Sequence, residues 1–388
     1  MHGLWTALAR QHDLTSVALA DDGFDLEECR AAMGRYSQEV LLLPNPRGRG
    51  GAMKRALQLR SLASVHSFER HRVEVPALGR ALDQLLRTRR FDVVNVEFPY
   101  LAHLRLRQAP PGTRPPAVVV DSHEIAHEMV RQFAAGRGSL GRTVYASLNW
   151  RKLRHEELAA YRSADGVAVC SEADRQRVLR DVPSARTVVV PNAADVDHYR
   201  PRSGDPSPDG RTVLFFGLLS TLPNIDGIRW FVREVWPRIT AVRPDARLEI
   251  LGKGAPREVE ALAAPGIEVA GFVEDLRPHL AAAAAVVVPL RLGGGTRLKI
   301  VEAMAMARPI VSTRLGAEGI EAEPGRELLL ADEPEAFAAA VLQLLQDPAS
   351  GARLGSAARR LSEERYSWTG AATAMDGLFQ QVLERRRT

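Results

Sequence analysis

The segment VVVPLRLGGGTRLKIVEAMAMARPIVSTRLGAEG, residues 286–319, decides the fold of this chain. Its β-branched run at 286–288 predicts a buried parallel strand, and three glycines follow before apolar residues return with helical spacing from Leu298. A glycine turn between a strand and a helix lets a ligand approach bare backbone, and the helix then offers unpaired N–H groups and its positive dipole end. The segment therefore predicts a phosphate-binding turn.

Charged side chains lie where this helix is predicted to begin. Arg297 and Lys299 fall in its first turn, where cations oppose the helix dipole, so a nearby polyanion would explain them. Glu302, about one turn further on, could accept hydrogen bonds from two adjacent sugar hydroxyls. A second strand at 310–312 and a second turn at 316–319 follow. Two strand ends and two glycine turns indicate a crevice at the carboxyl edge of a parallel sheet.

The block resembles the donor-binding motif of family 4 glycosyltransferases with the GT-B fold, in the branch reading G-G-G-T-R-L-K-I-x-E-A-M-A followed by S-T-x-x-G-A-E-G. The resemblance implies that Glu302 holds the ribose of a sugar nucleotide, while turn backbone and basic side chains hold its diphosphate. Many members carry an earlier glutamate that contacts the transferred sugar, and Gly294 stands at that position here. The identity of the sugar therefore does not carry over. The alternative is a plain helix N-terminus with solvated charges.

Further turns extend the predicted donor site. In the family, the turn after the strand at 212–216 commonly carries an Arg and a Lys that clamp the diphosphate, but here those places are uncharged. We therefore expect Arg297 and Lys299 to supply the charge. Glu318 could hold a sugar hydroxyl or stabilise a short helix, and the turn glycines could be structural. The expected donor-binding residues are Glu302, Gly293, Gly294, Gly295, Thr296, Leu298, Gly217, Asn224, Gly252 and Glu318.

Two positions in the first half of the chain follow predicted strand ends, where ligands bind in such sheets. His123 could donate a hydrogen bond to the transferred sugar or to the acceptor, with Asp121 and Glu124 capping the next helix. Glu97 stands where some relatives carry a histidine, and it could orient or deprotonate the acceptor hydroxyl. A structural histidine is the alternative. The expected catalytic residues are Arg297, Lys299, His123 and Glu97.

Strands alternate with helices on both sides of one irregular segment, which predicts parallel α/β sheets. That segment, 195–211, contains three prolines and two glycines and is the expected linker. We expect a first domain at 1–194, a nucleotide-sugar-binding domain at 212–365 and a last helix at 366–388. The resemblance implies the GT-B arrangement: two doubly wound Rossmann-like domains facing across a cleft, with the last helix crossing back. Other expected elements are helices at 53–65, 76–89 and 225–240 and a strand at 327–330.

Composition is typical of a soluble globular protein of 388 residues, with 45% hydrophobic and 26% charged residues. Cys29 and Cys170 form no spaced motif, so we expect a reducing compartment and no metal site. The apolar run at 280–290 is too short to span a bilayer, and the first residues lack a signal peptide pattern. These features predict a cytoplasmic protein.

The net charge of +5 is unevenly distributed. Residues 46–115 contain fourteen Lys and Arg but five Asp and Glu, and much of this excess falls on predicted helices. One interpretation is a solvated basic face. The other is peripheral contact with anionic lipid on the inner membrane face, or with a phosphorylated acceptor. Nucleic acid is not expected, because no aromatic-interleaved patch accompanies the charge.

The predicted function is that of a retaining glycosyltransferase that moves a sugar from a nucleotide-diphosphate sugar to a glycan or lipid-linked acceptor, as in polysaccharide biosynthesis. Retention is implied by the family resemblance, with an oxygen of the leaving diphosphate accepting the acceptor proton. No separate cofactor is expected, and charge stabilisation of the leaving group would carry catalysis. The alternatives are a nucleotide-sugar epimerase of the same architecture and a degenerate sugar-nucleotide binding protein.

Relatives open with an apolar strand and a Gly-Gly turn before a helix that resembles residues 3–12. Here Met1 falls at the start of that helix. We therefore expect either that the natural protein begins upstream of Met1 or that this form is weakened in catalysis while still binding donor.

Overall fold

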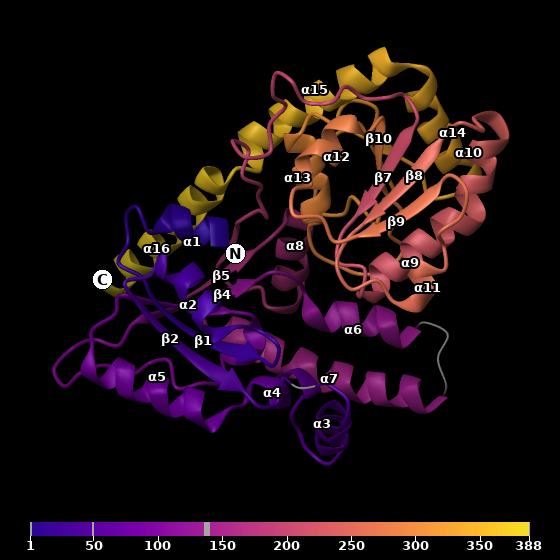
Figure 1. Cartoon of the computed structure of the whole chain (residues 1–388). Helices are drawn as coiled ribbons and strands as arrows, with labels where there is room; N and C mark the ends of the chain where they lie inside the picture. The colour runs from indigo at the N-terminus through magenta and orange to yellow at the C-terminus, as the bar shows by residue number, and fades with distance from the viewer. Residues whose placement is uncertain (1, 49, 136–139, 388) are drawn as a thin grey trace. The chain divides into compact units, whose positions relative to one another are not determined.

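The computed structural model describes residues 2–48, 50–135 and 140–387 and divides into two compact units (Figure 1). The first comprises Met1–Val190 and Ala372–Thr388, and the second comprises Pro191–Ala371. Strands pair in parallel in both units, which confirms the predicted α/β class. Residues 195–211, the expected linker, group with the second unit.

The described strands of the first unit form two separate sheets. One has two strands, and the other has four and contains β4, a run of β-branched residues that is buried along its whole length. Neighbouring strand ends lie side by side, because Glu97 of β3 pairs in register with Asp121 of β4. The first sheet contains β1 (Thr15–Asp21) and β2 (Glu39–Asn45), and the second contains β3 (Val93–Glu97), β4 (Ala117–Ser122), β5 (Gly166–Val169) and β6 (Thr187–Val189).

Helices of the first unit depart from the sequence expectation at α1, which ends at Leu8 rather than at residue 12, and at α3. The helix expected at 53–65 ends at Leu62, and an unpredicted helix, α4, follows it. Helix α4 begins after Ser67, because the Ser67 hydroxyl accepts a hydrogen bond from the backbone N–H of Arg70 and caps the helix. The helices are α1 (His2–Leu8), α2 (Leu26–Gly34), α3 (Ala52–Leu62), α4 (Phe68–Val73), α5 (Pro76–Thr88), α6 (Ala126–Ala135), α7 (Leu140–Ser163), α8 (Glu172–Asp181) and α16 (Trp368–Arg387), with a 3-10 turn at Pro99–Leu101.

The last helix, α16, packs within the first unit, as the GT-B resemblance implies. A Cβ placed on Gly166 of β5 would lie 2.8 Å from the side chain of Leu378, so the helix approaches the strand closely. Arg386 donates a hydrogen bond of 2.9 Å to the carbonyl of Pro115. Residues 372–387 of α16 therefore belong to the first unit, whereas residues 368–371 group with the second.

The second unit has one six-stranded sheet in the order β12-β11-β10-β7-β8-β9. The chain reverses its direction of strand addition between β7 and β10, and a ligand crevice is expected at such a switch point. The strand expected at 327–330 is shorter, because the backbone and carboxylate of Glu327 bond back to Glu323 in a turn. The strands are β7 (Thr212–Phe216), β8 (Arg247–Leu251), β9 (Ile267–Gly271), β10 (Ala285–Val288), β11 (Ile310–Ser312) and β12 (Leu329–Leu330).

Helices cover both faces of this sheet. Val213 and Phe215 of β7 join one buried cluster, and Leu214 and Phe216 join another on the opposite face. The helix expected at 225–240 is interrupted by a π segment at Phe231–Val235, because Pro237 lacks the N–H that an α-helix needs there. The helices are α9 (Leu222–Trp230), α10 (Trp236–Val242), α11 (Arg257–Glu260), α12 (Arg277–Ala282), α13 (Leu298–Ala305), α14 (Pro334–Gln346) and α15 (Pro348–Arg365).

Candidate functional site

Most of the predicted donor residues gather at the switch point of the second unit. The turn after β7 begins at Gly217, and the glycine loop after β10 leads into α13. The two strands are hydrogen-bonded neighbours, so their carboxyl ends bring both loops to the same edge of the sheet. The structure therefore brings the two loops together at the sheet edge where the sequence predicts a crevice.

Two glycines are required here by close contacts. Gly217 has φ of 148°, and a Cβ on it would lie 2.9 Å from Nζ of Lys299. Gly252, at the end of β8, has φ of 150°, and a Cβ on it would lie 1.7 Å from the carbonyl oxygen of Gly217. Both positions exclude a side chain. The backbone of this turn thus packs directly against the lysine.

Lys299 is the most unusual side chain of the site. It is 8% exposed, its ammonium donates a 2.8 Å hydrogen bond to Oδ1 of Asn224, and it lies 4.3 Å from the ring centroid of Phe215. Burial, followed by the charge of Arg297, lowers its pKa to about 7. Among the described residues, no carboxylate lies within 4.0 Å of this ammonium. A bound anion would supply the missing countercharge.

Arg297 occupies a different place from the one predicted. It is the N-cap residue of α13, with extended φ and ψ of −88° and 105°, rather than part of the first turn. Its guanidinium donates to the carbonyl of Gly294, and a Cβ on Gly293 would lie 3.0 Å from its Nη2. Gly293 and Gly295 have φ of 106° and 75°. The glycine loop is therefore folded around the arginine at the start of α13.

The remaining loop residues differ in exposure. Thr296 is buried, and its carbonyl accepts a hydrogen bond from Asn192, whereas Leu298 is exposed. Gly294 has no atom within 4 Å of an added Cβ and no positive φ, so its backbone would accept a larger residue. The absence of a glutamate there is thus not imposed by packing.

Glu302 lies one helical turn beyond Lys299. Burial raises the pKa of its carboxyl to about 7, while Lys299 and a hydrogen bond from Tyr199 act in the opposite direction. Burial and the charge of Glu302 raise the pKa of Tyr199 to about 12. Tyr199 was not predicted as a site residue, because the segment around it has the composition of a linker and no motif marks it.

A second turn, after β11, lies beside this group. A Cβ on Gly316 would lie 2.6 Å from the carbonyl oxygen of Val288, so this turn packs against the end of β10. Its N–H donates to the hydroxyl of Thr313. Glu318, which follows in the same turn, is half-buried. The structure thus brings the second turn to the strand that carries the glycine loop.

The first unit brings its two candidate residues into direct contact. Nε2 of His123 hydrogen-bonds with the carboxylate of Glu97, and Oδ2 of Asp121 lies 4.0 Å from the same nitrogen. Phe98, which has an unusual positive φ of 74°, places its ring 4.9 Å from the imidazole. Parallel pairing of β3 with β4 creates this group, which follows from strand ends that are 24 residues apart in sequence.

The charges within this group shift the pKa values of Asp121 and His123. Burial, then the charge of Glu97, raises the pKa of Asp121 to about 7. Burial alone would lower the pKa of His123, but the hydrogen bond to Glu97 and the charge of Asp121 raise it above its ordinary value. Their potential ligand atoms lie within 4.8 Å of one another, so the three side chains could also hold a divalent cation. The group can donate a proton or orient a hydroxyl.

A residue that the sequence did not suggest, Glu157, contributes to the capping of the next helix. The carboxylate of Glu157, on α7, accepts hydrogen bonds from the backbone N–H groups of Ala126 and His127 at the start of α6. It also accepts from Nδ1 of His127 and from the hydroxyl of Tyr161. Glu157 therefore anchors α6, and the carboxylate of Asp121 faces His123 instead.

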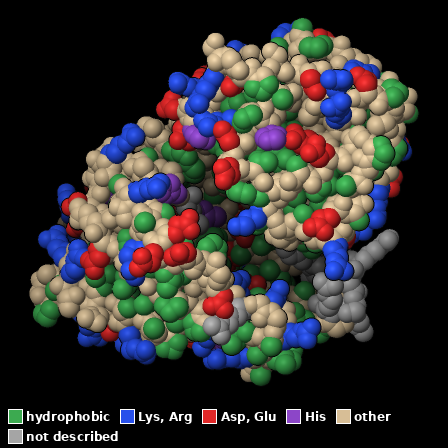
Figure 2. Space-filling model, viewed as in Figure 1, with side chains coloured by type: hydrophobic (Ala, Val, Ile, Leu, Met, Phe, Trp, Pro, Cys, Tyr) green, Lys and Arg blue, Asp and Glu red, His purple; other side chains and the backbone are tan. Residues whose placement is uncertain are grey.

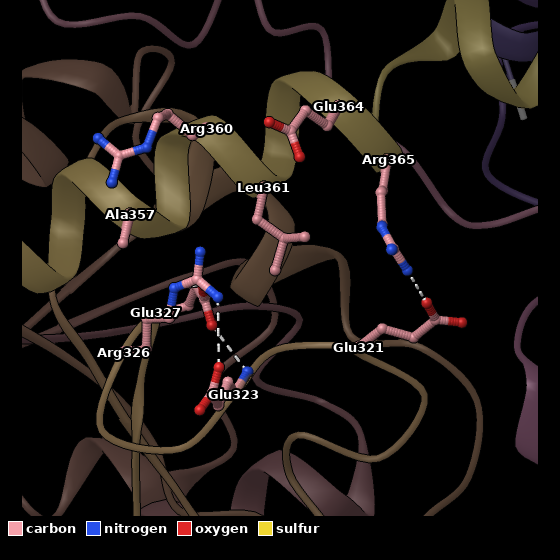
Figure 3. Close-up of a pocket in the computed structure, with 9 residues that line it drawn as sticks. All are labelled: Glu321, Glu323, Arg326, Glu327, Ala357, Arg360, Leu361, Glu364 and Arg365. Atoms are coloured by element: carbon pink, nitrogen blue, oxygen red, sulfur yellow. Dashed lines mark hydrogen bonds and ion pairs between the residues drawn. The ribbon is translucent and has the colours of Figure 1, made fainter.

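A pocket of about 340 Å³ in the second unit contains none of the predicted site residues (Figure 3). Its lining is mostly charged, and Arg326 pairs with Glu323 and Glu327 at 3.3 and 3.1 Å. Arg365 pairs with Glu321 across the lining. These internal pairs use much of its charge, so the pocket is not assigned to the chemistry of the donor residues.

In the described part of the chain, no helix combines the length and apolarity that a bilayer-spanning segment requires.

Two family models match the chain. The model described as Glycosyltransferase Family 4 matches residues 1–198, and the model described as Glycosyl transferases group 1 matches residues 210–347. The chain is 27% identical over 249 residues to the GDP-mannose-dependent alpha-(1-6)-phosphatidylinositol monomannoside mannosyltransferase of Mycolicibacterium smegmatis, covering 58% of this chain and 64% of that protein. It spans between 35% and 64% of the length of the curated relatives compared with it.

Solved structures resemble the whole chain. Sucrose-phosphate synthase from Thermosynechococcus elongatus superposes with a TM-score of 0.66 at 16% identity, covering 96% of this chain and 100% of that one. Anabaena Alr3699/HepE in complex with UDP and glucose gives a TM-score of 0.62 at 14% identity, covering 100% of this chain and 96% of that one. Identities this low show a shared fold alone.

Proposed function

The chain belongs to glycosyltransferase family 4 and has the GT-B fold, and from this premise we propose that it is a retaining glycosyltransferase using a nucleotide-diphosphate sugar. The observation that carries the proposal is the buried Lys299, which has no carboxylate partner within 4.0 Å among the described residues. Burying a cation is costly unless a counterion accompanies it. A diphosphate beside the glycine loop would be that counterion.

The donor would be held by three kinds of contact. Backbone N–H groups at the start of α13 and the guanidinium of Arg297 would bind the diphosphate together with Lys299. The carboxylate of Glu302 would accept hydrogen bonds from the ribose hydroxyls. The M. smegmatis relative is named for GDP-mannose, and the Anabaena structure contains UDP and glucose. Both are compatible with this arrangement, which does not select a base.

Transfer with retention would proceed on one face of the sugar. The bond from the anomeric carbon to the diphosphate oxygen breaks, the bond to the acceptor oxygen forms, and the acceptor proton moves to a phosphate oxygen of the leaving group. Arg297 and Lys299 would stabilise the charge that develops on that leaving group. In the first unit, His123 and Glu97 would donate to or orient a reacting hydroxyl.

The acceptor would be a glycan or a lipid-linked sugar, as in polysaccharide or glycoconjugate biosynthesis. A cytoplasmic location with peripheral contact with an anionic membrane completes the proposal. The basic excess of the first unit supports this contact.

A catalytically degenerate binding protein is the second candidate. Gly294 favours it, because the residue removes a contact to the transferred sugar although its backbone would accept a larger side chain.

The test is transfer from a panel of radiolabelled nucleotide sugars to glycan and lipid-linked acceptors, with Lys299→Met as the matched inactive control. Wild type should release nucleoside diphosphate in step with labelled product of retained configuration, and the variant should not. Binding of a donor without turnover on any acceptor would favour the degenerate protein, and release of an isomerised sugar would identify an epimerase.

A further inference from the structure

Helices α3 and α7 of the first unit expose apolar side chains to solvent. Leu59 and Leu62 of α3 are 68% and 48% exposed, and Val65, just after α3, is 79% exposed. Val144 and Leu148 of α7 are 51% and 40% exposed. A single exposed leucine needs no explanation, but a group on two helices marks a contact surface.

The two helices are neighbours joined by direct bonds. The hydroxyls of Ser61 on α3 and Tyr145 on α7 lie 3.2 Å apart, and Lys152 of α7 donates to the carbonyl of Ser61. Each helix carries one mixed stripe with spacing i, i+4, i+7, which places its members along one helix face. The stripes are Arg55, Leu59 and Leu62 on α3, and Val144, Leu148 and Arg151 on α7.

Basic side chains surround these apolar residues. Residues 46–68 and 140–155 contain no Asp or Glu. The exposed cations Lys54, Arg55, Arg60 and Arg151 have no carboxylate within 4.0 Å among the described residues. Some basic residues elsewhere in the same unit are paired, as Arg154 is with Asp181 at 2.8 Å. Green and blue side chains lie together over α3 at the lower edge of the space-filling view (Figure 2).

We propose that this α3–α7 surface, formed by the five apolar and four basic residues named above, docks on an anionic phospholipid bilayer. Cations attract anionic headgroups, and apolar side chains between them enter the boundary between headgroups and acyl chains. A nucleic acid would instead favour aromatic side chains for base stacking, and the nine residues include none.

The inference deepens the proposed function, since an enzyme held on a bilayer meets a lipid-linked acceptor in that plane. The lipid contact itself needs no sugar transfer, because all nine residues lie outside the donor site of the second unit. The two ideas can therefore fail separately.

The experiment is co-sedimentation of the full chain with phosphatidylcholine vesicles, with and without phosphatidylglycerol. Wild type should bind the anionic vesicles and release them as salt concentration rises. Lys54→Glu, Arg55→Glu and Arg60→Glu combined should weaken binding about 100-fold, since each cation contributes about fivefold near an anionic surface. Leu59→Gln, Leu62→Gln and Val65→Gln combined should also weaken it, by about tenfold.

Matched controls come from the second unit. Val242 and Phe272 are 54% and 68% exposed there, so Val242→Gln with Phe272→Gln removes comparable apolar surface and should leave vesicle binding unchanged. Arg353→Glu with Arg360→Glu is the charge control. All variants should keep the wild-type circular dichroism spectrum and thermal unfolding transition, which shows that both units fold.

Equal binding of wild type and the charge-reversed variant would overturn the proposal, as would no binding to anionic vesicles. Retention on polyglutamate beads without vesicle binding would also overturn it and indicate an acidic protein as the occupant. Vesicle binding without sugar transfer to any acceptor would support the surface and count against the proposed function. Transfer to lipid-linked acceptors without vesicle binding would support the proposed function and overturn the α3–α7 surface.

Discussion

At the scale of single residues, Lys299 makes a direct prediction about protons. Its pKa of about 7 in the ligand-free protein means that the side chain is mostly neutral at pH 8. A bound diphosphate favours the charged form, so binding at pH 8 should take up as much as about one proton. Glu302, also with a pKa of about 7, is already mostly ionised at pH 8 and contributes little.

Isothermal titration calorimetry in two buffers of different ionisation enthalpy measures this uptake, and Lys299→Met should abolish it. Binding without proton uptake in wild type would contradict the diphosphate role of Lys299.

The lowered pKa of Lys299 also makes the stability of the folded protein depend on pH. The unfolded lysine, with a pKa of about 10.4, binds the proton that the folded one has lost between about pH 7 and 10, so the stability of the ligand-free protein should rise with pH across that window.

The positions of the candidate donor residues could be predicted from the sequence, but their burial and contacts could not. Arg297, Lys299 and Glu302 are contiguous in one motif, so their grouping was predictable. The burial of Lys299 was not, because Phe215 and Asn224 come from the segment around β7. The contact between His123 and Glu97 likewise depends on the pairing of β3 with β4, which no local pattern specifies.

At the scale of elements, the segment 195–211 is tied to α13, the helix that carries Lys299 and Glu302. Arg359 of α15 donates to the carbonyls of Tyr199 and of Ala305, the last residue of α13. The backbone next to the Tyr199 ring is thus fixed to the same helix as Glu302. This clamp explains how a stretch with the composition of a linker supplies a residue to the site.

Tyr199→Phe should weaken nucleoside diphosphate binding only in a limited pH range. Loss of the hydroxyl raises the pKa of Glu302 above about 7, so more of the carboxyl is protonated at neutral pH. The affinity relative to wild type should fall between about pH 7 and 8 and recover by about pH 9, where both proteins carry a carboxylate. Tyr366→Phe is the control, because the Tyr366 hydroxyl accepts a 2.7 Å hydrogen bond from Glu321 in the same unit. A loss independent of pH would mean that Tyr199 acts only through packing.

Element types were predictable where one local signal dominated. The run of β-branched residues in β10 forms the buried strand that it predicts. Boundaries failed where a second signal competed, as at Pro237, which converts one expected helix into two joined by a π segment. Residues 316–319 form the expected turn, but nothing local shows how closely it packs on β10.

At the scale of the whole molecule, donor binding and acceptor chemistry are assigned to different units. Glu302→Gln in the second unit should weaken nucleoside diphosphate binding by about 1.5–3 kcal/mol, or roughly 10- to 150-fold. His123→Ala in the first unit should lower kcat and leave that affinity unchanged. Titration and steady-state kinetics on the same samples separate the two effects.

A 2′,3′-dideoxy nucleotide sharpens this comparison, since it lacks the ribose hydroxyls. Wild type and Glu302→Gln should bind the dideoxy nucleotide equally well. If His123→Ala weakens nucleoside diphosphate binding as much as Glu302→Gln does, the division of roles between the units is wrong.

The separate β1–β2 sheet has a consequence for how the chain opens. An isolated pair of strands is marginal by itself, and most residues of β1 and β2 are only half-buried, whereas β10 is wholly buried. Backbone amides of residues 15–21 and 39–45 should therefore exchange with deuterium well before those of 285–288. Local opening should start in the first unit and leave Lys299 and Glu302 in place, so under the proposed function a partly opened chain should still bind a nucleoside diphosphate.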